Sequence, residues 1–144
     1  MKTITLCSSM SFYEDVMKIG KNLESTEFSV LYPESALIMN RKNDYNPKHF
    51  RKNLTPQAKG KFIKLHFDKI AQSDAILIIN NTKNGMRGYI GANAAMEMGI
   101  AFHLGIKIYL LNKYPKSGPF HDEISAMNPT VLNGKIDTLR KLTS

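Results

Sequence analysis

The sequence alternates between short aliphatic segments and longer segments whose apolar residues recur at helical spacing, and this alternation constrains the fold more than any other feature. Strands are predicted over residues 3–7, 28–32, 75–79 and 106–111, with a short edge strand over 130–132. Strands that alternate with helices are typical of a parallel sheet covered on both faces. We therefore predict one domain over residues 1–144, an α/β fold with a three-layer, doubly wound, mostly parallel sheet of about five strands, Rossmann-like or flavodoxin-like.

The helical segments differ in how apolar they are. Phe12, Val16, Ile19 and Leu23 recur at intervals of four, three and four residues, and Ser11 is placed to cap this first helix. Further helices are predicted over residues 56–73, 92–104, 120–127 and 136–142. Because residues 92–104 are almost all apolar or small, we expect that helix to be buried on most sides.

The positive charge of the chain is concentrated in one segment. The net charge is +8, and residues 41–64 carry eight Lys and Arg side chains against a single acid, Asp44. Such a segment attracts phosphate groups of a nucleotide, a nucleic acid or another anionic partner, or it forms a solvated face. Residues 33–55, which overlap it, are short of apolar residues, and we interpret them as a mobile or ligand-binding connection without assigned structure.

Cysteine use and hydropathy bear on the cellular setting. Cys7 is the one cysteine, so an internal disulfide is excluded, and no signal segment is recognised at the start of the sequence. The longest aliphatic run, residues 75–79, is far shorter than the roughly 20 residues of a transmembrane helix. These features predict a cytoplasmic protein without a membrane-spanning segment.

Ligands of such folds bind beyond the carboxyl ends of the strands, which directs attention to residues 8–11, 80–91 and 112–122. The first of these loops offers hydroxyls and backbone N–H groups at a helix N-terminus, which suit a phosphate or a ribose hydroxyl. The glycines of the second loop lack the spacing of dinucleotide or ATP sites. His49, His66, His103 and His121 show no ligand-like spacing with Cys7, so neither a metal nor a cofactor is predicted.

Glu97 is the most unusual polar residue of the sequence. On a helix it is followed on the same face by Ile100, Ala101 and Leu104, and Asn93 is its polar neighbour one turn earlier. A carboxylate on an apolar stripe, near the start of a helix that follows a glycine-containing loop, is expected to be partly desolvated and held at a cleft. The alternative is a first-turn glutamate that is stabilised by the helix dipole.

Several motifs occur in the order and spacing of a known family. They lie at residues 6–10, 73–78, 88–93, 96–99 and 101–108. Over about residues 3–132 the chain resembles the nucleoside 2-deoxyribosyltransferase-like superfamily, and in particular a small branch with the pattern Tyr-Ile-Gly-x-Asn-x-x-x-Glu. The superfamily includes transferases that exchange bases between nucleosides and N-glycosidases that release the base from deoxynucleoside 5′-monophosphates. The resemblance implies that Glu97, within Met96-Glu97-Met98-Gly99, is the nucleophile.

The chain departs from the family pattern at three positions. Ser8 replaces the glycine of a Cys-Gly-Ser loop, and a second acid found in many transferases falls on Gly91. A further aspartate of the family falls on His66, with Asp68 two residues later, and either could stand in for it. The alternative is that Asp68 is a solvated helix residue and that His66 packs locally. The predicted catalytic residues are therefore Glu97, His66 and Asp68.

Other residues are predicted to bind the substrate. They are Cys7, Ser8, Ser9, Met10, Asn80, Arg87, Gly88, Tyr89, Gly91 and Asn93. Arg87 is placed to hold a 5′-phosphate, or is an exposed loop arginine, and Asn93 either contacts the sugar or base or caps its helix. By resemblance, a homodimer or larger homo-oligomer shares its active sites, with His121, Asp122, Glu123 and Asn128 reaching across to the neighbouring subunit.

These observations lead to one preferred function and two alternatives. We expect cleavage of the N-glycosidic bond of a nucleoside or its 5′-monophosphate through a covalent glycosyl-Glu97 intermediate, which passes to water or to a second base. The missing acid at Gly91 favours hydrolysis. The first alternative is a non-catalytic nucleotide-binding or sensing module of the same fold, and the second is nucleic-acid binding by residues 41–64.

Overall fold

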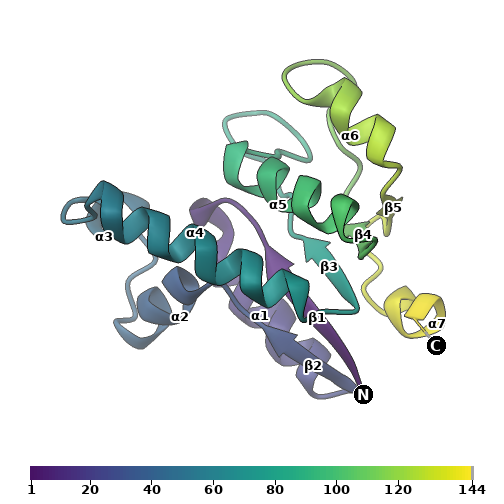
Figure 1. Ribbon diagram of the computed structural model, residues 1–144, viewed down its shortest axis with the longest axis horizontal. Helices are drawn as coiled ribbons and strands as arrows, with labels where there is room; N and C mark the ends of the chain where they lie inside the picture. The colour runs from purple at the N-terminus through teal and green to yellow at the C-terminus, as the bar shows by residue number, and fades with distance from the viewer. Residues whose placement is uncertain (144) are drawn as a thin grey trace.

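A five-stranded, all-parallel sheet forms the centre of the computed structural model, which describes residues 1–143 (Figure 1). The strands are β1 (Lys2–Cys7), β2 (Phe28–Leu31), β3 (Ala75–Ile78), β4 (Lys107–Leu110) and β5 (Thr130–Val131), in the spatial order β2-β1-β3-β4-β5. Ile4 in β1 pairs with Val30 on one side and with Ala75 on the other. This is the strand order of flavodoxin-like folds, and the predicted three-layer α/β architecture is confirmed.

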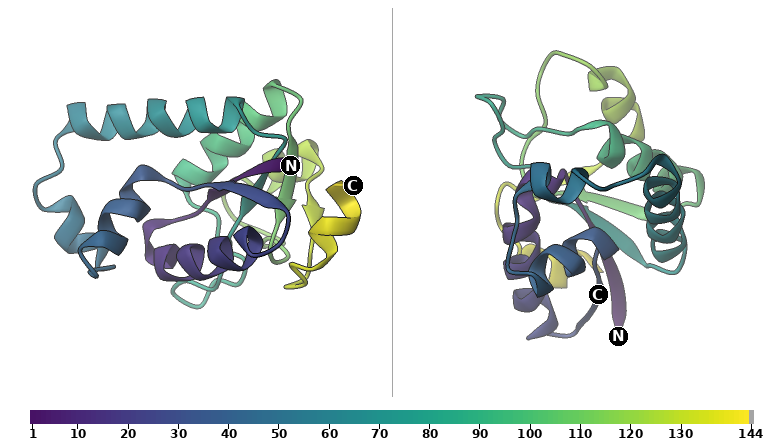
Figure 2. Two further views of the ribbon diagram at one scale, coloured as in Figure 1. Left: turned by 90° about the horizontal axis from the view of Figure 1, so that it is seen from below. Right: turned by 90° about the vertical axis from the view of Figure 1, so that its left-hand side faces the viewer.

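Helices cover both faces of the sheet (Figure 2). After β1 come a 3-10 turn, η1 (Met10–Phe12), and α1 (Tyr13–Glu24), followed later by α2 (Glu34–Arg41), α3 (Pro47–Arg51), α4 (Pro56–Ala71), α5 (Ala92–His103), α6 (His121–Met127) and α7 (Thr138–Thr143). Side chains of α1, α2 and α7 share one core with the sheet, whereas α4, α5 and α6 share the other.

The strands belong to both cores because successive side chains of a strand point to opposite faces. In and just after β3, Leu77 and Ile79 pack in the core with α1, while Ile76 and Ile78 pack in the core with α4 and α5. All four are fully buried. Burial on both faces explains why the central strands are continuous aliphatic runs in the sequence.

The start of the first helix differs from the prediction. Ser9, not Ser11, is the cap, and its side chain accepts a hydrogen bond from the backbone N–H of Ser11. That bond begins η1, and α1 follows at Tyr13 without a side-chain cap of its own. The short 3-10 turn moves the cap two residues toward β1.

Residues 33–55, to which the sequence assigned no structure, contain α2 and α3, and four of them, Pro33, Glu34, Ser35 and Leu54, line the cleft described below. Ala36 and Met39 of α2 are buried against α1. The side chain of Asn46 caps α3 by accepting from the N–H of Lys48, and Pro47 occupies the first turn. Both helices are too short to show a clear apolar period in the sequence.

The expectation that the helix at residues 92–104 is buried on most sides is wrong. Ala94, Met98 and Ala101 of α5 are buried, but Met96, Phe102 and Leu104 are about half exposed, at 44%, 56% and 49%. The sheet, α4 and α6 leave part of this helix uncovered, so some of its apolar side chains face outward. No helix among residues 1–143 combines the length and the apolar character needed to cross a membrane.

Candidate functional site

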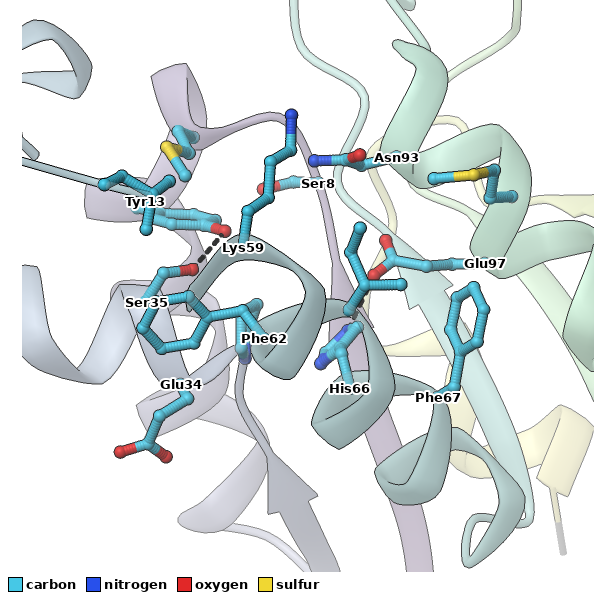
Figure 3. Close-up of a pocket in the computed structure, with 15 residues that line it drawn as sticks. Ser8, Tyr13, Glu34, Ser35, Lys59, Phe62, His66, Phe67, Asn93 and Glu97 are labelled. Atoms are coloured by element: carbon cyan, nitrogen blue, oxygen red, sulfur yellow. Dashed lines mark hydrogen bonds and ion pairs between the residues drawn. The ribbon is translucent and has the colours of Figure 1, made fainter. Parts of the chain in front are cut away.

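A cleft opens at the carboxyl ends of β1 and β2 and beside the start of α5 (Figure 3). Including its part open to solvent, it has a volume of about 590 Å³. It is lined by Ser8, Met10, Tyr13, Pro33, Glu34, Ser35, Leu54, Lys59, Phe62, Ile63, His66, Phe67, Asn93, Met96 and Glu97.

The strand order explains the position of this cleft. The chain leaves β1 toward α1 on one face of the sheet, whereas it leaves the neighbouring strand β3 toward α5 on the opposite face. The two connections diverge, so a crevice forms between them, as in other doubly wound folds. The first loop of the chain and the first turns of α5 therefore face the same space.

Glu97 and His66 form a buried pair at the floor of the cleft. Oε2 of Glu97 lies 3.2 Å from Nε2 of His66, and both side chains are about nine-tenths buried or more. The carboxyl group of Glu97 points from α5 into the cleft (Figure 3). Burial raises the pKa of Glu97 from 4.5 to about 8, because a charged carboxylate loses its hydration there.

Burial also favours the neutral forms of two residues next to Glu97, His66 and Cys7. Burial and, to a smaller extent, the nearby Lys69 ammonium lower the pKa of His66 from 6.5 to about 4. Cys7, at the end of β1, has its Sγ 3.4 Å from Nε2 of His66, and burial raises the pKa of its thiol. Nδ1 of His66 is buried and makes no hydrogen bond within the described part of the chain.

Two ionisable groups lie in contact here. The raised pKa of Glu97 and the lowered pKa of His66 favour a protonated carboxyl group beside a neutral imidazole at neutral pH, with Oε2 of Glu97 3.2 Å from Nε2 of His66. Transfer of the proton from Glu97 to His66 creates a carboxylate and an imidazolium. When Glu97 is deprotonated, the pair presents a carboxylate to a ligand that develops positive charge. When Glu97 is protonated, the pair presents a proton donor to the ligand.

The opposite wall of the cleft carries polar groups that the sequence did not single out. Tyr13 and Ser35 are joined by a hydrogen bond of 2.8 Å between their hydroxyls, and burial raises the pKa of Tyr13. Lys59, in the second turn of α4, is the one Lys or Arg among the lining residues. Tyr13 and Ser35 come from the regions that follow β1 and β2, so a search of the segments after every strand would have included both.

Six of the predicted site residues lie together in or below the cleft. Ser8, Met10, His66, Asn93 and Glu97 line it, and Cys7 lies beneath them against His66. Asn93 is exposed in the first turn of α5 and does not cap the helix, because Gly91 occupies the cap position. Of the two alternatives for the second catalytic residue, His66 contacts Glu97, while Asp68 is exposed beside Lys64, at 3.9 Å.

The residues predicted on the loop after β3 lie outside the cleft. Asn80 is fully buried and hydrogen-bonds through its amide to the backbone of Gly88 and Asn112. Arg87 borders a separate, shallow depression together with Lys113. The physical reason is that Asn80 ties this loop to the end of β4, away from α4 and Glu97.

The other predicted site residues that do not line the cleft make contacts that support the fold. Gly88 has a φ of +69°, and a Cβ atom there would lie 1.9 Å from the carbonyl oxygen of Lys113. Tyr89 packs edge-on against Phe12, and Gly91 lies against the Tyr89 ring. Ser9 caps η1, and its Oγ accepts from the Lys83 ammonium at 3.5 Å.

The residues expected to reach across a dimer lie on and after α6. Nδ1 of His121 is 2.9 Å from the carbonyl oxygen of Pro115, and Asn128 ends the helix in a left-handed conformation. Asp122 and Glu123 are exposed in the first turn of α6. None of these four residues lines the cleft of its own chain.

With this geometry in view, the chain was compared with known proteins. No family model matches it, and no match is found among curated proteins or among solved structures. The resemblance to the nucleoside 2-deoxyribosyltransferase-like superfamily therefore stays a prediction.

Proposed function

We propose that this chain cleaves the N-glycosidic bond of a nucleoside or its 5′-monophosphate, with Glu97 as the nucleophile. The observation that carries the proposal is the Glu97 carboxyl group on the floor of the cleft, 3.2 Å from Nε2 of the buried His66. The family resemblance of the motif around Glu97 supports the same role. Hydrolysis is favoured over base exchange, because Gly91 occupies the position of the second acid and also lies outside the cleft.

The proposed reaction begins with proton transfer from Glu97 to Nε2 of His66. The carboxylate then attacks C1′ of the sugar, the C1′–N bond breaks, and the base leaves with the bonding electron pair and takes a proton from water. The hydroxide that remains attacks C1′ of the glycosyl ester, which releases the sugar and regenerates the carboxylate. Return of the proton from His66 to Glu97 restores the starting state.

The lining of the cleft suits a nucleotide. Phe62 and Phe67 of α4 offer apolar surface for a base, while Ser8 and Asn93 offer hydroxyl and amide groups for a sugar. Lys59 supplies a positive charge for a 5′-phosphate. This assignment moves the phosphate contact from Arg87, which lies apart, to Lys59.

The test is detection of free base by chromatography. The protein is incubated with ribo- and deoxyribonucleosides and their 5′-monophosphates, with and without a second base. We expect base release that falls at least about 1,000-fold in both Glu97→Ala and Glu97→Gln. Glu14→Gln, at an exposed position on α1 outside the cleft, is the matched control and retains activity. Release that survives both Glu97 variants would overturn the proposed role of Glu97.

One observation favours a second candidate, a non-catalytic module that binds nucleotides. The pKa of Glu97 is raised to about 8, so the carboxyl group is protonated at neutral pH and hydrogen-bonds as a neutral group. Calorimetric titration with the same compounds separates the two candidates. Binding that is retained in Glu97→Ala, together with no base release by the unmodified protein, identifies the binding module.

We also propose that the protein is a homo-oligomer. The support is the exposed apolar side of α5, where Phe102 and Leu104 are about half exposed. Light scattering after size-exclusion chromatography measures the mass, and we expect Phe102→Asp to reduce it to that of a monomer. Met86→Asp is the control, since Met86 is an exposed apolar residue on the loop after β3. A monomeric unmodified protein would refute the proposal.

A further inference from the structure

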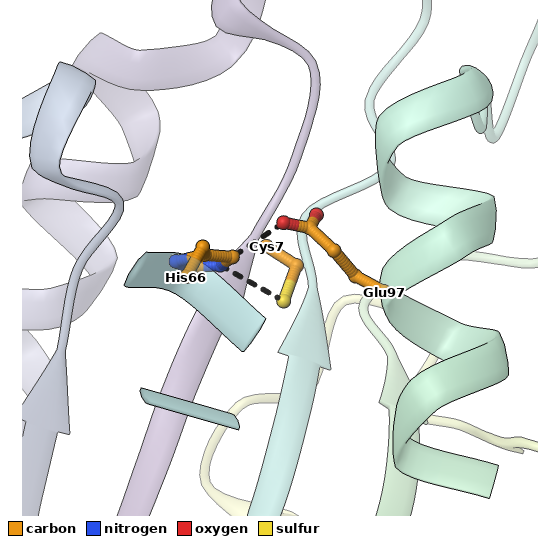
Figure 4. Close-up of side chains that lie close together, drawn as sticks. All are labelled: Cys7, His66 and Glu97. Atoms are coloured by element: carbon orange, nitrogen blue, oxygen red, sulfur yellow. Dashed lines mark hydrogen bonds and ion pairs between the residues drawn. The ribbon is translucent and has the colours of Figure 1, made fainter. Parts of the chain in front are cut away.

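Three metal-ligating side chains converge below the cleft (Figure 4). Cys7 comes from the end of β1, His66 from α4 and Glu97 from α5. Sγ of Cys7 lies 3.4 Å from Nε2 of His66, and Nε2 lies 3.2 Å from Oε2 of Glu97. The three ligand atoms all lie within 4.8 Å of one another.

Two of these spacings are close to those of ligands around one small cation. Zinc binds sulfur at about 2.3 Å and nitrogen or oxygen at about 2.0–2.2 Å, so the ligand atoms of a tetrahedral site are roughly 3.3–3.6 Å apart. The two distances to Nε2 of His66 are already close to this range. An ion bound by all three groups therefore requires side-chain movements of Cys7 and Glu97 that bring their ligand atoms within this range.

We propose that Cys7, His66 and Glu97 form a binding site for one divalent transition-metal ion of the Zn²⁺ type, with a fourth coordination position that faces the cleft. A thiolate, an imidazole and a carboxylate together favour Zn²⁺ or Co²⁺ over Mg²⁺ and Ca²⁺, which prefer oxygen ligands. The open fourth position follows from the geometry, because Glu97 and His66 line the cleft while Cys7 closes the site from below.

Burial distinguishes this cluster from the second contact between a histidine and a carboxylate among residues 1–143, which joins His49 and Asp44. Cys7 is fully buried, and His66 and Glu97 are 5% and 9% exposed. By contrast, His49 and Asp44 form an exposed pair of only two ligands. Binding at the buried cluster displaces the thiol proton of Cys7 and the carboxyl proton of Glu97 to solvent, since a metal coordinates the deprotonated groups.

The proposed ion and the proposed glycosidase reaction compete for the same carboxylate. A metal ion that holds an oxygen of Glu97 takes away the electron pair needed for attack at C1′. The metal-bound chain is therefore inactive in base release, and a chelator restores the activity. This consequence rests on the proposed function, but binding of the ion does not.

Absorption spectroscopy with Co²⁺ tests the site without any activity. The chain contains a single cysteine, so a thiolate-to-cobalt charge-transfer band in the near ultraviolet can arise only from Cys7. Chelator-treated protein is incubated with Co²⁺, and we expect this band together with the visible bands of four-coordinate cobalt. Added Zn²⁺ then displaces the cobalt and removes both.

Variants assign the other two ligands. Cys7→Ser is expected to abolish the charge-transfer band, and His66→Gln and Glu97→Gln each weaken Co²⁺ binding by at least about tenfold, since even loss of a group that only supports a ligand costs 10–100-fold. His49→Gln is the matched control and leaves the spectrum unchanged. Circular dichroism of each variant identifies any that fails to fold, and a folded His66→Gln or Glu97→Gln variant with unchanged binding contradicts the assignment.

The two proposals fail in different ways. Absence of the thiolate band in the unmodified protein overturns the metal site, whatever the chain does to nucleosides. Absence of base release by chelator-treated protein overturns the glycosidase and leaves the spectral result in place. Base release that is unaffected by saturating Zn²⁺, in a protein that shows the cobalt spectrum, overturns the role of Glu97 as a shared group.

Discussion

Oε2 of Glu97 and Nε2 of His66 lie 3.2 Å apart, and burial shifts the pKa values of the two groups in opposite directions. In the unfolded chain, Glu97 loses its proton near pH 4.5 and His66 near pH 6.5. In the folded chain the order is reversed, with pKa values of about 8 for Glu97 and about 4 for His66. Because of this inversion, the free energy of unfolding decreases as the pH rises above 6.5.

Between pH 6.5 and 8 the folded chain holds one proton, on Glu97, that the unfolded chain has lost. Where the folded state binds more protons than the unfolded state, the free energy of unfolding falls as the pH rises. We therefore expect it to fall by about 1.4 kcal/mol per pH unit, or about 2 kcal/mol over this window. Between pH 4.5 and 6.5 the unfolded chain carries an equivalent proton on His66, and the curve is flat.

Urea denaturation at several pH values, with a chelator present, measures this dependence. Glu97→Gln is expected to remove the fall between pH 6.5 and 8, because the amide does not titrate. Glu34→Gln, which changes another glutamate of the cleft, keeps the fall. A curve of unchanged slope in Glu97→Gln would show that the proton resides elsewhere.

Recognition of a 5′-phosphate, if the proposed function holds, depends on Lys59 and not on Arg87. Lys59 lines the cleft, whereas Arg87 borders a separate depression. We expect Lys59→Gln to raise the KM for 5′-monophosphates by about tenfold, which corresponds to loss of about 1.4 kcal/mol of binding, and to leave the KM for nucleosides unchanged. Arg87→Gln is the matched comparison, and equal effects of both variants would contradict this assignment.

The hydroxyl pair on the far wall contributes to stability. Tyr13 and Ser35 are both buried and hydrogen-bond at 2.8 Å. Tyr13→Phe leaves the Ser35 hydroxyl without this partner, and we expect a loss of about 1–2 kcal/mol in urea denaturation. Tyr114→Phe removes an exposed contact to Ser125 at 3.2 Å and is expected to cost less than about 0.5 kcal/mol. Similar losses in the two variants would argue against the buried bond.

The loop after β3 contains two glycines with positive φ and different surroundings. A Cβ at Gly88 would meet the carbonyl oxygen of Lys113 at 1.9 Å, but one at Gly85 meets nothing within 4 Å. Gly88→Ala therefore suffers both backbone strain and a backbone collision, and we expect it to lose about 3 kcal/mol or more. Gly85→Ala suffers only the strain, about 1 kcal/mol. Thermal unfolding of the pair separates the two effects, and equal shifts in Tm would refute the collision.

Most of the fold could be predicted from the sequence because its strands are buried on both faces. Residues 75–79 are aliphatic throughout for this reason, and helix spacing identified α1 and α4. The helices α2 and α3 could not be found in the same way, since they are short and bury few side chains. The exposed side of α5 also could not be inferred, because apolar composition does not reveal how much of a helix its neighbours cover.

The site was partly predictable for a related reason. Glu97 stood out because a carboxylate on an apolar stripe is costly unless it has a partner, and the partner is His66. The loop after β3 was assigned too large a part, because nothing local in the sequence shows that Asn80 binds to Asn112. The approach of Cys7 to His66 and Glu97 likewise depends on the order of the strands, and no spacing along the chain encodes it.

One helix joins the mouth of the cleft to its floor. Lys59 and His66 both belong to α4 and lie two turns apart, about 10 Å along the axis. Because an α-helix moves nearly as a rigid rod, any tilt of α4 at Lys59 also changes the distance between Nε2 of His66 and Oε2 of Glu97. Under the proposed function, the group of a ligand that binds Lys59 would therefore also shift the contact between His66 and Glu97.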